Sequence, residues 1–201
     1  MSHDKHQEFY DSLAAEWDLM FTAEDLERLS HLVDTFEIEP GYDVLDLGCG
    51  TGILFDMLRR RVGPEGTVTG VDFSFQMARR AHRNFPFDNV NVVDADATNL
   101  PFRADTFDMA FSFSSFDNFS DQRKALDEAH RVLKPGANFC IIYLVSSHEL
   151  SDQHKQAGGV LAGDKLPTRE RMGELFDVSH FDTVRIDDQP GLYFACAINV
   201  K

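Results

Sequence analysis

The stretch from residue 44 to residue 52 reads Val44-Leu45-Asp46-Leu47-Gly48-Cys49-Gly50-Thr51-Gly52. Residues 42–47 predict a short buried strand, and residues 53–61 carry apolar side chains at helical spacing. Glycine lets the backbone adopt a positive φ and approach a ligand closely, and the first turn of a helix leaves N–H groups unpaired. The sequence therefore predicts a strand, a ligand-binding glycine loop and a helix. The alternative is an ordinary glycine turn that binds nothing.

The spacing of these glycines indicates the kind of ligand. A dinucleotide fingerprint has glycine at the first, third and sixth positions of the loop, and the sixth position here is Ile53. Asp46, at the carboxyl end of the predicted strand, would repel a pyrophosphate but attract an ammonium or sulfonium group. A nicotinamide-dependent oxidoreductase, which would share the architecture, is therefore disfavoured.

The pattern Asp-x-Gly-x-Gly-x-Gly resembles the first motif of class I S-adenosylmethionine-dependent methyltransferases. The run Arg131-Val132-Leu133-Lys134-Pro135-Gly136 resembles the ubiquinone and menaquinone biosynthesis type of this family, and the resemblance extends over roughly residues 40–145. It implies that S-adenosyl-L-methionine is the cofactor and that the loop binds it through Asp46, Gly48, Cys49 and Gly50.

Composition limits the alternatives. A chain of 201 residues predicts one domain, residues 1–201, and a net charge of −15 argues against a nucleic-acid substrate. No apolar run approaches the roughly 20 residues of a membrane span, and the polar amino terminus lacks a signal sequence, so we expect a cytoplasmic protein. Cys49, Cys140 and Cys196 show no metal-ligand spacing and are predicted to be reduced thiols. We expect no metal site, and the oligomeric state stays open.

Three further predicted strands end in polar residues. Residues 67–71 lead to Asp72, whose two carboxylate oxygens could accept both hydroxyls of a ribose. The resemblance assigns the ribose-binding role to Asp72. It implies that Asp96 and Ala97, after residues 90–93, bind the edge of the adenine. It also implies that Ser112 lies near the reacting methyl group. Nearby, Phe73 and Met77 could line the adenine pocket or fill the core.

The amino-terminal residues 1–40 predict a helical cap. Aromatic and apolar side chains, Trp17 among them, recur on one face of residues 3–18, and Thr22 can cap a second helix through Asp25. The resemblance implies that such helices cover the cofactor and that Tyr10 reaches its methionine carboxylate. Packing against the domain is the alternative for Tyr10 and Trp17.

Alternating strands and helices predict a three-layer α/β sandwich of the Rossmann-like type. Residues 74–85 predict a helix with Phe75 and Met77 inward, and residues 138–145 a fifth strand. Residues 183–187 and 192–200 alternate around Pro190-Gly191, which predicts a hairpin. We therefore expect a mostly parallel seven-stranded sheet with an antiparallel last strand.

The implied reaction is in-line methyl transfer to a small molecule. Positioning could supply much of the rate, and a base is needed only for an unactivated nucleophile. Asp117 is the candidate base, and a solvated loop aspartate is the alternative. No Pro-Pro-Tyr or Pro-Pro-Phe follows the predicted fourth strand, residues 109–113, which argues against methylation of base amino groups. A non-catalytic sensor that binds the same cofactor is the alternative function, and the acceptor atom is not set by the sequence.

Residues 146–167 are polar and rich in glycine, and they are too long for an ordinary connection. We expect this segment to form a lid over the substrate. His148 and His154 are its candidate substrate-binding groups, with exposed loop histidines as the alternative. Their spacing and the lack of a nearby cysteine argue against a metal site.

Overall fold

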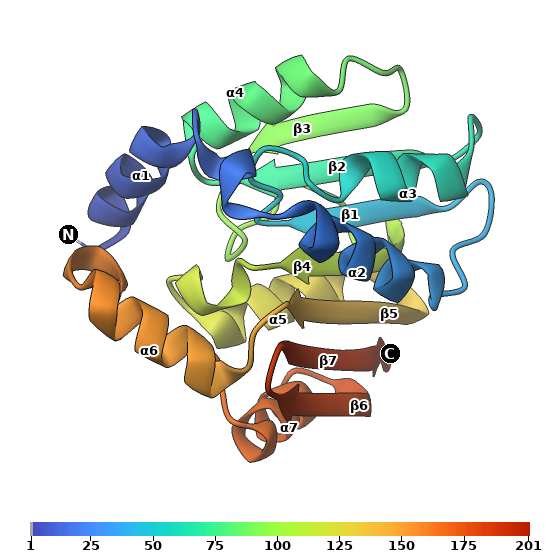
Figure 1. Cartoon of the computed structure of the whole chain (residues 1–201). Helices are drawn as coiled ribbons and strands as arrows, with labels where there is room; N and C mark the ends of the chain where they lie inside the picture. Colours follow the sequence, from blue (N-terminus) through green and yellow to red (C-terminus); the bar gives the residue numbers. More distant parts are fainter. Residues whose placement is uncertain (1) are drawn as a thin grey trace.

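A computed structural model describes residues 2–201, with side chains described from residue 5 onward. One seven-stranded sheet runs through the molecule in the order β3-β2-β1-β4-β5-β7-β6 (Figure 1). The strands are β1 (Asp43–Leu47), β2 (Thr67–Asp72), β3 (Val90–Asp94), β4 (Phe107–Phe113), β5 (Leu133–Tyr143), β6 (Phe181–Gln189) and β7 (Leu192–Asn199). The α-helices are α1 (Ser2–Leu13), α2 (Ala23–Asp34), α3 (Phe55–Val62), α4 (Phe75–Asn84), α5 (Gln122–Val132), α6 (Ser147–Ala157) and α7 (Arg169–Val178), and the 3-10 helices are η1 (Trp17–Met20), η2 (Phe116–Asn118) and η3 (Gly159–Gly163).

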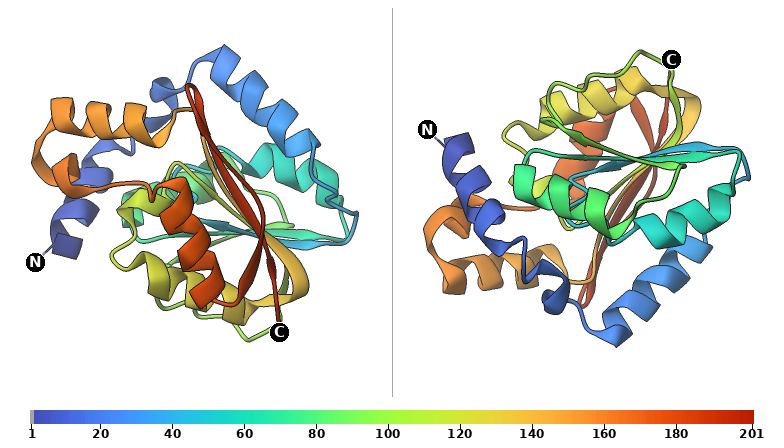
Figure 2. Two further views of the ribbon diagram at one scale, coloured as in Figure 1. Left: turned by 90° about the horizontal axis from the view of Figure 1, so that it is seen from below. Right: turned by 90° about the horizontal axis from the view of Figure 1, so that it is seen from above.

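The register of the sheet confirms the predicted architecture. β3, β2, β1, β4 and β5 pair in parallel, and β7 pairs antiparallel with both β5 and β6. Helices cover both faces (Figure 2). Apolar side chains of α2 and α3 are buried on one face, and those of α5 and α7 on the other. The carboxyl ends of the five parallel strands therefore meet at one edge, where α1 and α6 also lie (Figure 1).

Local signals fix several helix ends. Thr22 and Asp25 form the predicted capping box at α2, and Ser146 with Glu149 forms another at α6. The first predicted helix is shorter than expected, since α1 ends at Leu13 and Trp17 begins a separate 3-10 turn. This turn places residues 17–21 beside the glycine loop instead of continuing along α1.

Two predicted details are wrong. Phe75 is 48% exposed and does not point inward, because it follows the cap residue Ser74 and lies on the outer face of α4 near Arg79. β5 begins at Leu133 instead of residue 138, because the chain around Gly136 forms a bulge against β4 instead of a separate turn. Neither change moves a residue of the predicted site.

The cysteine prediction is also wrong in part. Cys140 on β5 and Cys196 on β7 are cross-strand neighbours and form a disulfide, which leaves only Cys49 free among the residues described. The register of β5 against β7 brings the two sulfurs together, and nothing in the local sequence reveals that register. Among residues 2–201, no helix is both long and apolar enough to cross a bilayer.

Candidate functional site

The glycine loop wraps closely around the carboxyl end of β2. The N–H groups of Gly48 and Cys49 donate to the carbonyl of Val71 at 2.8 and 3.0 Å. Gly48 has a φ of +71°, and a Cβ at this position would lie 2.4 Å from the Cβ of Ser115. Only glycine fits there, so the loop stays open and its backbone remains accessible.

Asp72 connects this loop to the start of α4. Its Oδ2 accepts a hydrogen bond from the Gly50 N–H and its Oδ1 accepts one from the Ser74 N–H, both at 2.8 Å. Burial raises the pKa of Asp72 to about 6, although these two donors act in the opposite direction. The carboxylate thus lies at the mouth of the loop, as its position at the carboxyl end of β2 predicts.

Asp46 is the last residue but one of β1, beneath the same loop, and is 1% exposed. Its Oδ1 has no hydrogen-bond partner among the residues described. Burial, reinforced by the charge of Asp72, raises the pKa of Asp46 to about 8. An unpaired buried carboxylate is costly, and a ligand with a positive charge would offset that cost.

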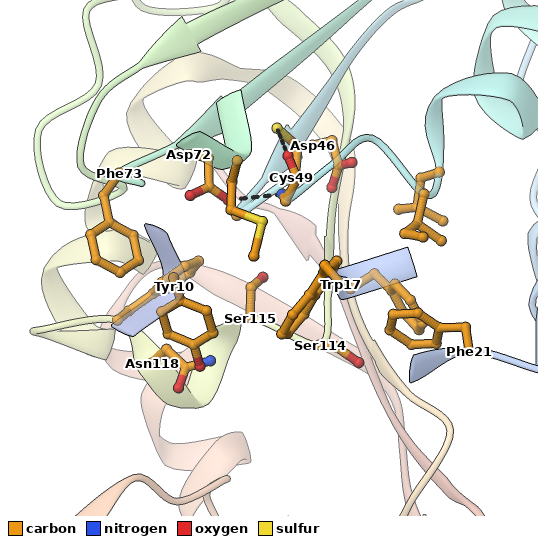
Figure 3. Close-up of a pocket in the computed structure, with 17 residues that line it drawn as sticks. Tyr10, Trp17, Phe21, Asp46, Cys49, Asp72, Phe73, Ser114, Ser115 and Asn118 are labelled. Carbon is orange, nitrogen blue, oxygen red and sulfur yellow. Dashed lines mark hydrogen bonds between the residues drawn. The ribbon is translucent and has the colours of Figure 1, made fainter. Parts of the chain in front are cut away.

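An aromatic wall faces these carboxylates across the pocket (Figure 3). The Tyr10 ring packs edge-on against Trp17 at 5.7 Å and against Phe73 at 5.9 Å. Thr51 of the loop donates to Asp18, which is held next to Trp17. The turn of residues 17–21, which we call the strap, is therefore fastened directly to the glycine loop.

Most predicted cofactor residues are brought together here. The pocket is lined by Tyr10, Asp46, Gly48, Cys49, Gly50, Asp72, Phe73 and Met77. Asp96 and Ala97 line an adjoining hollow that also includes Asp72 and Phe73. Tyr10 and Trp17 pack against other aromatic side chains of the domain, which was the alternative interpretation for them. Both also line the pocket.

Ser112 lies one layer deeper than predicted. It is fully buried, does not line the pocket, and its hydroxyl bonds that of Ser115 at 2.7 Å. Ser115 in turn donates to the carbonyl of Leu47 at 2.8 Å and faces the pocket. Sequence reasoning missed Ser115 and its neighbours Ser114, Asn118 and Phe119, although the polar run directly after β4 is a signal for them.

A second cavity, of about 550 Å³, adjoins the first between the amino-terminal segment and α6. Its walls are mostly apolar, and Leu13, Leu150 and Leu161 are among them. It shares five residues with the first pocket: Tyr10, Trp17, Phe21, Ser114 and Asn118. Asp117, Tyr143 and His154 are among the polar residues that line it, together with Asp25, Gln153, Ser114 and Asn118.

Asp117 is buried, so its interpretation as a solvated loop aspartate is wrong. The Tyr143 hydroxyl donates to Asp117 Oδ1 at 2.5 Å and accepts a hydrogen bond from the backbone N–H of Asp117 at 2.9 Å. Burial raises the pKa of Asp117 to about 6, while the Tyr143 hydrogen bond and the charge of His154 act in the opposite direction. Asp117 thus has the burial and the fixed orientation of a functional carboxylate.

The two predicted histidines separate. His154 is 8% exposed and its Nε2 lies 3.7 Å from Oδ2 of Asp117, so it is not an exposed loop residue. His148 has an 85% exposed side chain, is paired with Asp152 on the outside of α6, and lines none of these cavities. The prediction that both histidines face the substrate is therefore wrong for His148. The residues described contain no cluster of histidine, cysteine or acidic side chains suited to a metal ion.

Comparison with known proteins gives matches to both the sequence and the fold. Residues 45–141 match a family model described as a methyltransferase domain. Over these residues the chain is similar to the class I S-adenosylmethionine-dependent methyltransferases. It is 42% identical over 108 residues to a 2-phytyl-1,4-naphtoquinone methyltransferase of Nostoc sp., which covers 52% of this chain and 47% of the relative. It is 38% identical over 107 residues to a demethylmenaquinone methyltransferase of Staphylococcus epidermidis, covering 53% and 44%.

The fold of this chain is also found among solved structures. A protein solved in complex with the Haloferax volcanii Trm112 methyltransferase activator superposes with a TM-score of 0.82 at 20% identity, covering 96% of this chain and 98% of that one. The chain spans a little under half the length of the two curated relatives named above. The matched region holds the glycine loop, Asp72 and Asp117, whereas Tyr10 and Trp17 precede it and His154 follows it.

The residues of the pocket fit the cofactor that the resemblance implies. A Cβ would fill the cradle at Gly48, and Asp46 presents a buried carboxylate oxygen that lacks a partner among residues 2–201. S-adenosyl-L-methionine has the positive charge that such a carboxylate favours. Asp46 and Asp72 would hold its charged and hydroxylated parts, and Asp96 and Ala97 border the space next to them.

Proposed function

We propose that this chain transfers a methyl group from S-adenosyl-L-methionine to a small, largely apolar acceptor with an aromatic ring of the quinol type. One observation carries the proposal: the glycine-loop pocket and the cavity of about 550 Å³ share a wall that includes Tyr10 and Trp17. Two ligands could therefore lie next to each other, which in-line transfer requires. The ring named for the Nostoc relative and the apolar walls of the cavity support an aromatic acceptor.

The chain's own residues divide the work between the two ligands. When bound, the cofactor supplies a methyl group on a positively charged sulfur, and the acceptor's electron pair forms the new bond to carbon while the broken bond's pair stays on sulfur. Asp46 and Asp72 bind on the cofactor side, and the strap excludes water from above the loop. A net charge of −15 supports a small molecule over a nucleic acid as the acceptor.

The proposal predicts that cofactor binding changes the intrinsic fluorescence of the protein. Trp17 is the only tryptophan of the chain and lines both cavities, so its fluorescence should change when S-adenosylhomocysteine binds. Calorimetry should give a dissociation constant on the order of 1–10 μM. Binding of NAD in place of S-adenosylhomocysteine would contradict the proposal, and binding without any methyl transfer to a panel of aromatic acceptors would favour a sensor.

Replacing Asp72 by alanine should weaken the binding of S-adenosylhomocysteine by roughly 10- to 150-fold, since a charged hydrogen-bonding group contributes about 1.5–3 kcal/mol to the binding free energy. The matched control is Asp94→Ala. Asp94 is the register partner of Asp72 on β3, is exposed and lines neither pocket, so this variant should bind normally. Calorimetry on both variants, with circular dichroism to verify folding, gives the comparison. Equal dissociation constants for the two variants would exclude Asp72 from cofactor binding.

A further inference from the structure

We infer that Asp117 and His154 form a binding position for a phenolic or enolic hydroxyl group of the acceptor, and that Asp117 receives the proton of that hydroxyl. The inference rests on the proposed function, because it concerns the second ligand of the same site. It adds a chemical class of acceptor and assigns a role to a pair of residues on separate elements, η2 and α6.

The distance between the two side chains matches one bridging ligand oxygen. Asp117 Oδ2 is buried, has no hydrogen-bond partner among the residues described, and lies 3.7 Å from His154 Nε2. That separation is too long for a direct hydrogen bond. An oxygen atom beside the pair could lie about 2.8 Å from both atoms. The other oxygen of Asp117, Oδ1, is already occupied by Tyr143, so only Oδ2 is left for a ligand.

The protonation pattern of the pair favours a hydroxyl over an ether. His154 Nδ1 lies 3.1 Å from the carbonyl oxygen of Asp164, which can only accept, so Nδ1 carries a hydrogen. Nε2 faces Asp117, and a hydroxyl oxygen can hydrogen-bond to Nε2 while donating its own proton to Asp117 Oδ2. An ether oxygen has no proton to give and would leave Asp117 Oδ2 buried without a partner.

The acidity of the hydroxyl decides which acceptors fit. Burial raises the pKa of Asp117 to about 6. Proton transfer from a phenol, with a pKa of about 10, is then unfavourable by about 10⁴, whereas transfer from a group as weakly acidic as water is unfavourable by about 10¹⁰. Phenolic and enolic hydroxyls are therefore accessible to this base and aliphatic alcohols are not.

The proton step balances within the site. The acceptor O–H bond breaks, the proton moves to Asp117 Oδ2, and the electron pair stays on the acceptor oxygen and its conjugated ring. His154 donates to the resulting oxyanion, and the proton leaves to water after the product departs. The other titratable groups that face the pair are Tyr143 on β5, Tyr10 on α1 and Asp164 after η3. Burial, and then the charge of Asp117, raises the pKa of Tyr10, so Tyr10 does not compete as a base.

Two probes with the same ring system test the binding position. We would titrate 1,4-dihydroxynaphthalene and 1,4-dimethoxynaphthalene, under nitrogen, into the complex with S-adenosylhomocysteine and follow Trp17 fluorescence. The wild-type complex should bind the diol at least about 10-fold more tightly. Asp117→Asn keeps an oxygen for Tyr143 but removes the base, and His154→Leu removes the second partner. Both variants should reduce the preference below about 2-fold.

His148→Leu is the matched control, because it makes the same substitution on the outer side of the same helix. It should keep the wild-type preference. All three variants should bind S-adenosylhomocysteine within about 2-fold of wild type, which also shows that they are folded. Methyl transfer to the diol should fall at least about 100-fold in Asp117→Asn. The rate of the wild-type protein should decrease below about pH 6, and this decrease should be absent in the variant.

The inference is overturned if the wild-type complex binds both probes equally or fails to bind the diol. It is also overturned if Asp117→Asn keeps the wild-type rate, in which case the proposed function still stands. Failure of S-adenosylhomocysteine to bind the wild-type protein would instead contradict the proposed function.

Discussion

Replacing Asp46 by asparagine should make the ligand-free protein more stable while it weakens cofactor binding. Asp46 is buried, one of its oxygens has no partner among residues 2–201, and Asp72 lies close enough to raise its pKa further. Asparagine has nearly the same shape and no charge. The substitution therefore removes the cost of a buried charge in the empty site, together with the group that would attract a cationic ligand.

The pH dependence of this effect has a definite sign. The pKa of Asp46 is raised to about 8 in the folded protein, above its ordinary value in an unfolded chain. The folded state therefore binds more protons than the unfolded state between about pH 4 and pH 8, and the free energy of unfolding falls as the pH rises through that window. Above pH 8, Asp46 is charged in the folded protein and its burial lowers the free energy of unfolding by the full amount. At such a pH, Asp46→Asn should raise the free energy of unfolding by about 1–3 kcal/mol.

Thermal unfolding of wild type and Asp46→Asn at pH 6 and pH 8.5 measures the difference directly. The gain in melting temperature should be larger at pH 8.5, and S-adenosylhomocysteine should bind the variant at least about 10-fold more weakly. Asp43→Asn, at the other end of β1, is the control for binding and should leave the affinity unchanged. A variant that is less stable at pH 8.5 and binds normally would show that Asp46 is structural.

The parts of the site that lie at strand ends could be predicted from sequence. Asp46, Asp72 and Asp96 each follow a short apolar run, and in a parallel sheet such positions share one edge. The hydrophobic pattern indicates where each strand lies, and the intervening helix makes successive strands parallel. The position of these carboxylates can therefore be predicted without knowledge of long-range contacts. The glycine loop is equally local, because Gly48 and Gly50 need positive φ within one turn.

The acceptor side could not be assembled in the same way. Asp117, Tyr143 and His154 come from η2, β5 and α6, and their meeting depends on how α6 packs across the end of the sheet. The polar sequence of α6 gave no signal of which histidine is buried. His148 and His154 look alike in the sequence, and only the orientation of the helix separates them.

Register and facing direction account for the remaining errors. Cys140 and Cys196 pair because β7 is antiparallel to β5 with one particular register, which alternation of side chains alone does not fix. Phe75 was placed on the inner face of α4 by helical periodicity, yet at the first position of the helix its ring turns outward. Both errors lie outside the site, so the prediction of the cofactor residues was unaffected.

Replacing Gly50 by valine should abolish cofactor binding, with a loss of at least about 100-fold, or about 2.7 kcal/mol. A Cβ at Gly50 would lie 3.3 Å from the indole nitrogen of Trp17, so the two methyl groups of valine would fill the space between the loop and the strap. The residue also has a φ of +54°, where a β-branched side chain is strained by about 1–3 kcal/mol. Strain alone would lower stability, and the blocked space would lower affinity.

A second glycine separates these two effects. Gly63 ends α3 with a φ of +66°, and a Cβ there would meet nothing within 4 Å. Gly63→Val should therefore lose a similar amount of stability on thermal unfolding but bind S-adenosylhomocysteine as wild type does, by calorimetry and Trp17 fluorescence. If both variants lost binding equally, backbone strain would explain the result. If neither variant lost binding, the cofactor would not bind at the loop between β1 and α3. The reason is that a valine at position 50 would displace Trp17 and prevent any ligand from approaching the Gly50 backbone.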